Sequence, residues 1–181
     1  MSNKSKKLGL SVREITIFAA FASMMFLSTA LVKMIPNVHF LALFIGVCTL
    51  MYRTKALIPL YAYILLDWAL HGFTITLAPH LYIWLPLWFS FMIVGKIECK
   101  QRTKFVLYLI ICGLHGLCFG ILYAPAYALM FGLSFDAMIA WIVTGFPFDI
   151  IHAAGNVAAG TLIIPLLSLV RKLDSGQYKT T

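Results

Sequence analysis

Charged side chains are scarce in this sequence. Among its 181 residues, 11% are charged, 62% are apolar, and only 6 are acidic. About a quarter of the residues in a soluble domain are charged, because its surface must be hydrated. A chain of this length has too little interior to remove so many apolar side chains from water. The composition therefore excludes an ordinary soluble domain and predicts an integral membrane protein.

Sequence motifs that identify enzymes are missing too. There is no Gly-x-Ser-x-Gly nucleophile motif, no His-Glu-x-x-His zinc helix and no Gly-x-x-x-x-Gly-Lys phosphate-binding loop. The cysteines lack the paired spacing of a metal site and are expected to be ordinary thiols. They are Cys48, Cys99, Cys112 and Cys118. We therefore expect no cofactor, no metal and no catalytic activity, and any ATP hydrolysis would belong to a separate subunit.

Long apolar segments follow one another along the chain. About 20 helical residues cross the ~30 Å hydrocarbon layer, and fewer suffice for a helix buried among neighbours. The sequence predicts an all-α membrane protein with six transmembrane helices. The predicted spans are residues 15–32, 39–52, 56–77, 81–94, 105–131 and 147–170. Residues 34–38 contain Pro36 and Asn37, which favour a turn between the first two spans.

The last apolar stretch is too long for one simple span. Gly145-Phe-Pro147 is predicted to divide it, because proline is tolerated in the first turn of a helix. Residues 137–144 are then expected to form a short helix at the outer interface, and the sixth span is expected to begin near Pro147. Pro165 is expected to kink this span.

The basic residues predict the topology. Of the 14 Lys and Arg residues, all but Lys33 fall in four segments: the amino terminus, residues 53–55, residues 96–104, and the tail from Arg171. Six spans place all four segments in the cytoplasm, as the positive-inside rule requires. We expect one membrane domain, residues 15–170, with cytoplasmic tails at 1–14 and 171–181. The basic residues lie at the ends of apolar spans, as in a protein of the cytoplasmic membrane, and we expect that location. They form no continuous face, so we expect no binding of nucleic acid.

Polar side chains within the apolar spans are candidates for function, because such groups are costly at membrane depth. Asp67 and His71 are four residues apart and share a helix face. They form either a structural pair or a proton relay. Asp149, His152 and Asn156 also share a face, beside the Gly-Phe-Pro break, where free backbone N–H groups can meet a ligand. Asp149 has the alternative role of a helix cap.

Aromatic residues accumulate on the predicted outer side. They are Tyr82, Trp84, Trp88, Tyr123, Tyr127 and Trp141. Interfacial belts of Trp and Tyr are common in membrane proteins, so these residues also have a structural interpretation. His115, which lies near mid-depth in the fifth predicted span, is expected to have a structural role rather than a functional one. Stacking surfaces beside a few polar groups are also typical of a small-molecule pocket. We predict a substrate site formed by Asp149, His152, Asn156, Trp84, Trp88, Tyr123 and Trp141, with Asp67 and His71 as further candidates.

The chain resembles a known family of transport subunits. Six short spans, a basic amino terminus and the segment Trp141-Ile-Val-Thr-Gly-Phe-Pro-Phe-Asp-Ile-Ile-His152 are similar to the S components of energy-coupling factor (ECF) vitamin transporters. Riboflavin-binding members of that family have a similar Thr-Gly-x-x-Pro-Phe-Asn-x-x-Lys segment, whose Asn and Lys meet the ligand. The matching positions here are Asp149 and His152, and this change from Asn and Lys disfavours riboflavin as the ligand.

The same resemblance implies a partner and a mechanism without catalysis. Family members dock on a transmembrane coupling subunit through an Ala-x-x-x-Ala motif. The nearest match here is Ala19-x-x-x-Ser23, in which Ser replaces the second Ala and keeps the small-x-x-x-small spacing. The chain would bind a vitamin-like heterocycle and deliver it with the coupling subunit and two cytoplasmic ATPases. The polar residues leave two alternatives open. One is a small secondary transporter or channel with Asp67 and His71 as proton relay, and the other is a membrane enzyme.

Overall fold

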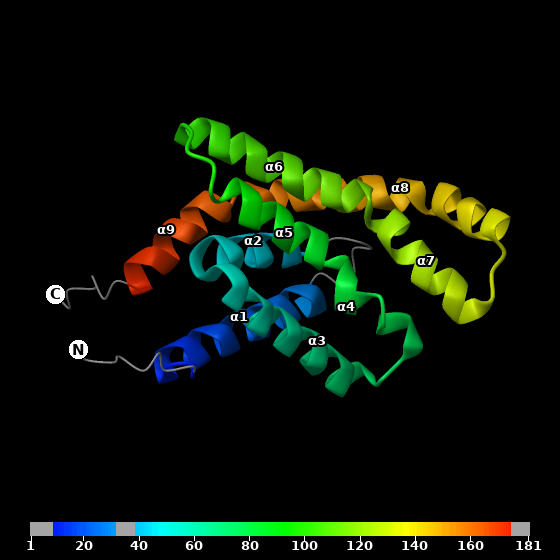
Figure 1. The fold of residues 1–181 in the computed structure, drawn as a ribbon, viewed down its shortest axis with the longest axis horizontal. Coiled ribbons are helices and arrows are strands. Elements are labelled where there is room, and N and C mark those ends of the chain that lie inside the picture. Colours follow the sequence, from blue (N-terminus) through cyan, green and yellow to red (C-terminus); the bar gives the residue numbers. More distant parts are fainter. Residues whose placement is uncertain (1–8, 32–38, 175–181) are drawn as a thin grey trace, which may run out of the picture.

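The computed structural model describes residues 9–31 and 39–174, and all regular secondary structure in these residues is helical. In chain order the described α-helices are α1 (Val12–Leu31), α2 (Leu41–Tyr52), α3 (Leu57–His71), α4 (His80–Ile83), α5 (Leu85–Val94), α6 (Gln101–Leu117), α7 (Phe119–Phe131), α8 (Phe135–Gly160) and α9 (Ile163–Asp174) (Figure 1). Two 3₁₀-helices, η1 (Arg53–Ala56) and η2 (Ile75–Leu77), flank α3. The turn predicted at residues 34–38 lies outside the described residues.

Several helical segments are long and apolar enough to cross a membrane. Within the described residues they are Val12–Leu31, Leu41–His71, Ile75–Val94, Gln101–Phe131 and Phe135–Gly160. The second segment is a pair of helices, because η1 separates α2 from α3 and α3 runs back along the bundle (Figure 1). Large apolar side chains such as Leu129 remain exposed on the outside of the bundle. The prediction of an all-α fold is confirmed, and the length and apolar character of these segments are consistent with a multi-pass membrane protein.

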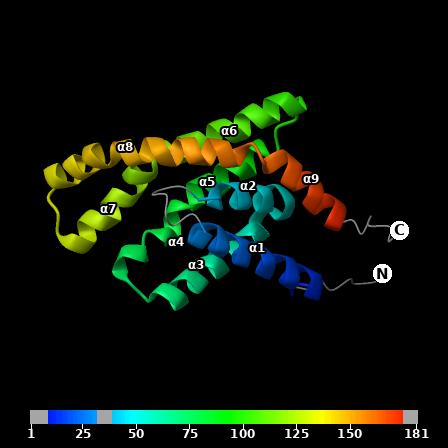
Figure 2. The same ribbon diagram turned by 180° about the vertical axis from the view of Figure 1, so that it is seen from behind.

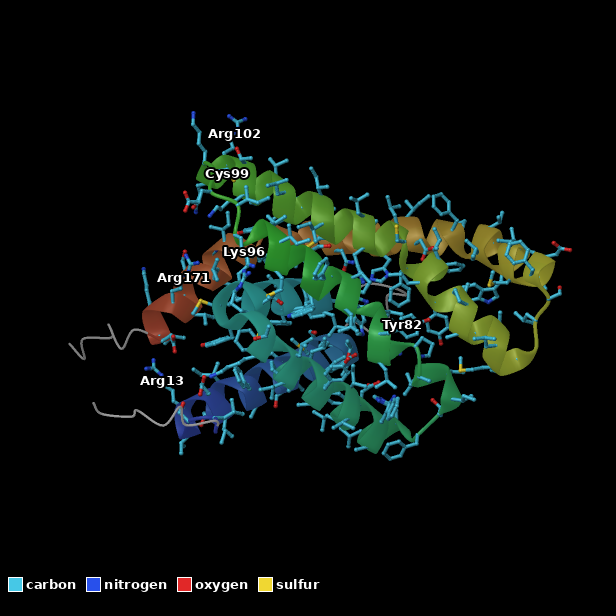
Figure 3. All side chains as sticks on the ribbon, in the orientation of Figure 1. Arg13, Tyr82, Lys96, Cys99, Arg102 and Arg171 are labelled. Atoms are coloured by element: carbon cyan, nitrogen blue, oxygen red, sulfur yellow. The ribbon has the colours of Figure 1, made fainter. Side chains whose placement is uncertain are left out.

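The basic residues gather at one end of the bundle. Arg13, Lys96, Arg102 and Arg171 lie at the end where α1 begins and α9 ends, and we call this the basic end (Figure 3). Tyr82 lies towards the opposite end (Figure 3). This distribution is the one that the positive-inside rule associates with a cytoplasmic face.

Side-chain bonds at the basic end tie α1 to its neighbours. The hydroxyl of Ser11 and the carboxylate of Glu14 form a reciprocal capping box at the start of α1, with Ser11 N to Glu14 Oε2 at 2.9 Å. Glu14 also forms a salt bridge with Lys55. Arg13 donates to the carbonyl oxygen of Leu173 at 2.8 Å and pairs with Asp174. The start of α1 is thereby joined to η1 and to the end of α9.

The contact between α6 and α8 depends on small residues. A Cβ atom added to Gly116 would lie 2.5 Å from Cα of Ala153, so the two backbones touch. Gly113 faces Val157, and Gly160 of α8 faces Leu109 of α6, with the corresponding distances at 3.0 and 3.1 Å. Small residues allow this close approach in membrane bundles, where van der Waals contact drives helix association.

The division predicted at Gly145-Phe-Pro147 is wrong. Residues 137–144 do not form a separate interfacial helix, and the sixth span does not begin near Pro147, because α8 continues through Pro147 from Phe135 to Gly160. The hydroxyl of Ser134 caps this helix by accepting from Ala137 N. Pro147 removes one backbone hydrogen bond, and a helix of 26 residues retains enough others to stay continuous.

Breaks occur elsewhere in the predicted spans. The span predicted at 147–170 is interrupted between α8 and α9 at Thr161 and Leu162, four and three residues before Pro165 (Figure 2). The ring of a proline clashes with the carbonyl four residues earlier, which explains a break at this point. The span predicted at 105–131 divides at Cys118 into α6 and α7. Gly72, with φ of 89°, ends α3 at His71 rather than at residue 77.

Candidate functional site

A cleft of about 350 Å³ lies between α7 and α8. We call it the outer cleft, because α7 and α8 extend to the end of the bundle that is opposite to the basic end (Figure 1). It is lined by Phe119, Gly120, Tyr123, Tyr127, Trp141, Gly145, Phe148 and Asp149. Its volume is within the range of small-molecule sites.

Stacked aromatic rings form one wall of the outer cleft. Phe119, Tyr123 and Tyr127 are spaced by four residues along α7, which places them on one face. Trp141 of α8 stacks on Tyr123 and on Tyr127, with ring centroids 5.9 and 5.2 Å apart and interplanar angles of 16° and 26°. The hydroxyl of Tyr123 donates to the carbonyl oxygen of Thr76, which fixes this wall to the segment after α3. The predicted grouping of Tyr123 with Trp141 is confirmed.

Asp149 supplies the carboxylate of the outer cleft. Its side chain is buried, and its two oxygens accept from the backbone N–H of Gly120 at 3.1 and 3.2 Å. A Cβ atom on Gly120 would lie 2.5 Å from Asp149 Oδ2, so a larger residue here would displace the carboxylate from its bond to the backbone. Gly120 is in the first turn of α7, where backbone N–H groups lack partners within the helix. Asp149 is therefore a helix cap, as one of the predicted alternatives stated, but it caps α7 rather than its own helix.

A second polar group lies deeper in the bundle, and we call it the inner cluster. It consists of His39, Trp84, His115, His152 and Asn156. The ring of His152 is 4.6 Å from that of His39 and 6.4 Å from that of His115. Trp84 stacks on His115 at 5.3 Å. Asn156 is completely buried one helical turn beyond His152 on α8.

Most side-chain polar atoms of the inner cluster have no hydrogen-bond partner within residues 9–31 and 39–174. Among the described residues, nine buried side-chain nitrogen or oxygen atoms lack a hydrogen-bond partner, and seven of them belong to this cluster. They include both ring nitrogens of His152 and both amide atoms of Asn156. His115 uses one nitrogen, since its Nε2 donates to the carbonyl oxygen of Ile83 at 2.9 Å. Although three histidines converge, the described residues contain no group of side chains arranged to hold a metal ion.

Phe119 separates the outer cleft from the inner cluster. It lines the cleft, and its ring lies 4.6 Å from His152 and 5.8 Å from Trp84. Sequence reasoning missed this residue. The signal was present, because Phe119 is four residues from both His115 and Tyr123 and shares their helical spacing. Sequence reasoning also missed His39, which precedes α2 and contacts the cluster through Trp84 and His152.

Three other predicted site residues lie away from both groups. The indole nitrogen of Trp88 donates to the carbonyl oxygen of Arg53 at 3.2 Å, and Trp88 does not line the outer cleft. Asp67 and His71 contact each other on α3, with Oδ1 and Nδ1 3.0 Å apart, but they do not line the outer cleft. Their predicted proximity is confirmed. The side chain of Asp67 is 17% exposed and that of His71 is 45% exposed.

We compared the chain with known protein families, curated proteins and solved structures. No protein-family model, no curated protein and no solved structure gives a significant match to the chain.

Proposed function

We propose that this chain is the substrate-binding S component of an ECF-type importer and that it binds a small heterocyclic micronutrient in the outer cleft. The observation that supports this proposal best is the cleft itself, a 350 Å³ space with stacked rings on one side and a buried carboxylate on the other. Aromatic faces and a few placed polar groups are the usual composition of a small-molecule site. The chain would act with a coupling subunit and two ATPase subunits in the cytoplasmic membrane.

The decisive experiment identifies a bound molecule and an energy source. The protein is purified in detergent, and its small-molecule content is measured by mass spectrometry after denaturation. We expect a heterocycle in stoichiometric amount, and we expect its cellular uptake to require the ATPase subunits. Uptake by this chain alone, driven by a proton gradient and abolished by Asp67→Asn, would replace our proposal with the secondary transporter.

The face of α1 that carries Ala19 and Ser23 supports docking of a coupling subunit. Both residues are exposed on the bundle, and small residues four apart allow another helix to approach closely. We expect Ala19→Trp to abolish co-purification with the coupling subunit while ligand content stays unchanged. Ala62→Trp is the matched control, because Ala62 is exposed on α3. Assembly that survives Ala19→Trp would place the docking face elsewhere.

Six crossings with both termini in the cytoplasm are the second part of the proposal. Single cysteines at Ser2, Gln101 and Gln177 in a cysteine-free background are expected to be protected from an impermeant thiol reagent in intact cells. Ala78→Cys, between η2 and α4, is expected to be labelled. Permeabilised cells provide the control, since all four positions should then react. Labelling of Gln101→Cys in intact cells would contradict this topology.

A further inference from the structure

The outer cleft and the inner cluster offer different chemistry to a ligand. Among the described residues that line the cleft, Asp149 is the only acidic or basic side chain, and aromatic faces surround it. This half of the site suits a flat cation, because aromatic faces and a carboxylate both attract positive charge. The inner cluster contains no carboxylate, lysine or arginine, and instead combines imidazole, indole and amide groups.

The unpaired polar atoms of the inner cluster lower the stability of the ligand-free protein. Trp84, His152 and Asn156 are each 1% exposed or less. A buried donor or acceptor without a partner destabilises a protein, whereas an apolar residue of the same shape avoids this cost. Native structures leave few such groups, and those that they do leave require an explanation. Seven unpaired atoms in one cluster therefore indicate a purpose other than stability.

We propose, building on the substrate-binding function proposed above, that the two groups form one bipartite site. The outer cleft binds a flat cationic ring, and the inner cluster binds an uncharged donor–acceptor edge of the same molecule, such as a carboxamide or an aminopyrimidine edge. Asn156 presents an amide oxygen beside an amide nitrogen, which matches such an edge in the way that Asn pairs with adenine. Phe119 lies between the two halves and contacts both, so a substrate that occupies both halves has to displace its ring.

The spacing on α8 limits the size of the substrate. Asp149 and His152 are three residues apart, about 4.5 Å along the helix axis, and Asn156 is about 10.5 Å from Asp149. A molecule with one or two rings covers this distance. The substrate class is therefore a cationic aromatic heterocycle with an amide-like edge on the side remote from its charge.

Three probe molecules test this assignment. 1-Methylnicotinamide carries a flat cationic ring and a carboxamide, 1-methylpyridinium carries only the cation, and nicotinamide carries only the amide. We expect wild-type protein in detergent to bind 1-methylnicotinamide at least about tenfold more tightly than either of the others, which is the loss expected for about one hydrogen bond or ion contact. Dissociation constants are measured by isothermal titration or tryptophan fluorescence.

Two variants assign each half of the probe to its residue. Asn156→Leu is expected to bind 1-methylnicotinamide no more tightly than 1-methylpyridinium. It should still bind 1-methylnicotinamide more tightly than nicotinamide. Asp149→Asn is expected to do the reverse. Thr49→Val is the control, because Thr49 is buried on α2 with its hydroxyl already bonded to the carbonyl of Ile45. This control should leave all three affinities unchanged.

The thermal stability of the empty protein separates a ligand role from a structural one. Asn156→Leu removes two unpaired buried atoms, so we expect its melting temperature to rise by about 2 °C or more while probe binding weakens. A fall in melting temperature would show that Asn156 serves the fold and would overturn the proposal. Equal wild-type affinities for the three probes, or no binding, would overturn it as well. The importer function would be unaffected by that result, since co-purification and ATPase-dependent uptake test it separately.

Discussion

Gly116→Ala is expected to lower the stability of the folded protein by about 1–3 kcal/mol, the usual cost of overpacking a well-filled contact. The added methyl group would lie 2.5 Å from Cα of Ala153 and 2.6 Å from its backbone nitrogen. Backbone atoms cannot rotate away as a side chain does, so α6 and α8 must separate. Separation would also disturb the inner cluster, because His115 precedes Gly116 and His152 precedes Ala153. Thermal unfolding in detergent measures the effect.

Gly145→Ala provides the matched comparison for this substitution. Gly145 also lies within a helix, but a Cβ atom there would meet nothing within 4 Å. Alanine is favoured over glycine in helices by about 1 kcal/mol, so the melting temperature of this variant should stay the same or rise. Equal behaviour of the two variants would contradict the close contact between α6 and α8.

Asp149→Asn is expected to weaken binding of the heterocycle that we propose as the ligand by about 1.5–3 kcal/mol, or roughly 10- to 150-fold. We expect little loss of stability. The amide retains an oxygen that accepts from Gly120 N, and Asn caps helices about as well as Asp. What it loses is the negative charge in the outer cleft. Ligand content per purified protein and the dissociation constant of the identified molecule measure the change.

Asp149→Leu distinguishes the two roles of this carboxylate. It removes both the charge and the acceptor, so the first turn of α7 loses its cap and stability should fall by about 0.5–2 kcal/mol in addition to the loss of binding. If Asp149 serves only as a cap, Asp149→Asn will keep full affinity, and the outer cleft will need another recognition group.

The sequence predicts the helical segments better than it predicts the contacts between them. Apolar length and the positions of basic residues indicate the helical segments and their basic end, because both properties can be read along the chain. Trp88 shows the limit of this reasoning. It is one turn from Trp84, yet its indole bonds to Arg53, while Trp84 is buried against His115. Which neighbour a side chain meets depends on helix rotation and crossing, and linear spacing does not determine these.

Local sequence signals also compete with the length of a helix. Gly145 and Pro147 predict a break that α8 does not have, because the loss of one hydrogen bond is small beside those that the long helix keeps. Pro165 does coincide with an interruption, at Thr161 and Leu162, where the chain also has to change direction into α9. Asp67 and His71 could be paired from sequence, since their contact lies within one helix. The bond between Asp149 and Gly120 joins two helices, and no spacing rule indicates it.

The continuity of α8 has a thermodynamic consequence. This helix of 26 residues, about 39 Å long, carries Asp149 of the outer cleft and His152 and Asn156 of the inner cluster, and it runs on through one bend into α9. The end of α9 is held by Arg13 at the start of α1, the helix that exposes Ala19 and Ser23. If α8 tilts around the substrate that we propose for it, these contacts transmit the movement to α9 and α1. Such coupling is reciprocal. If substrate binding changes the affinity for a partner that binds α1 and α9, that partner changes the substrate affinity by the same factor.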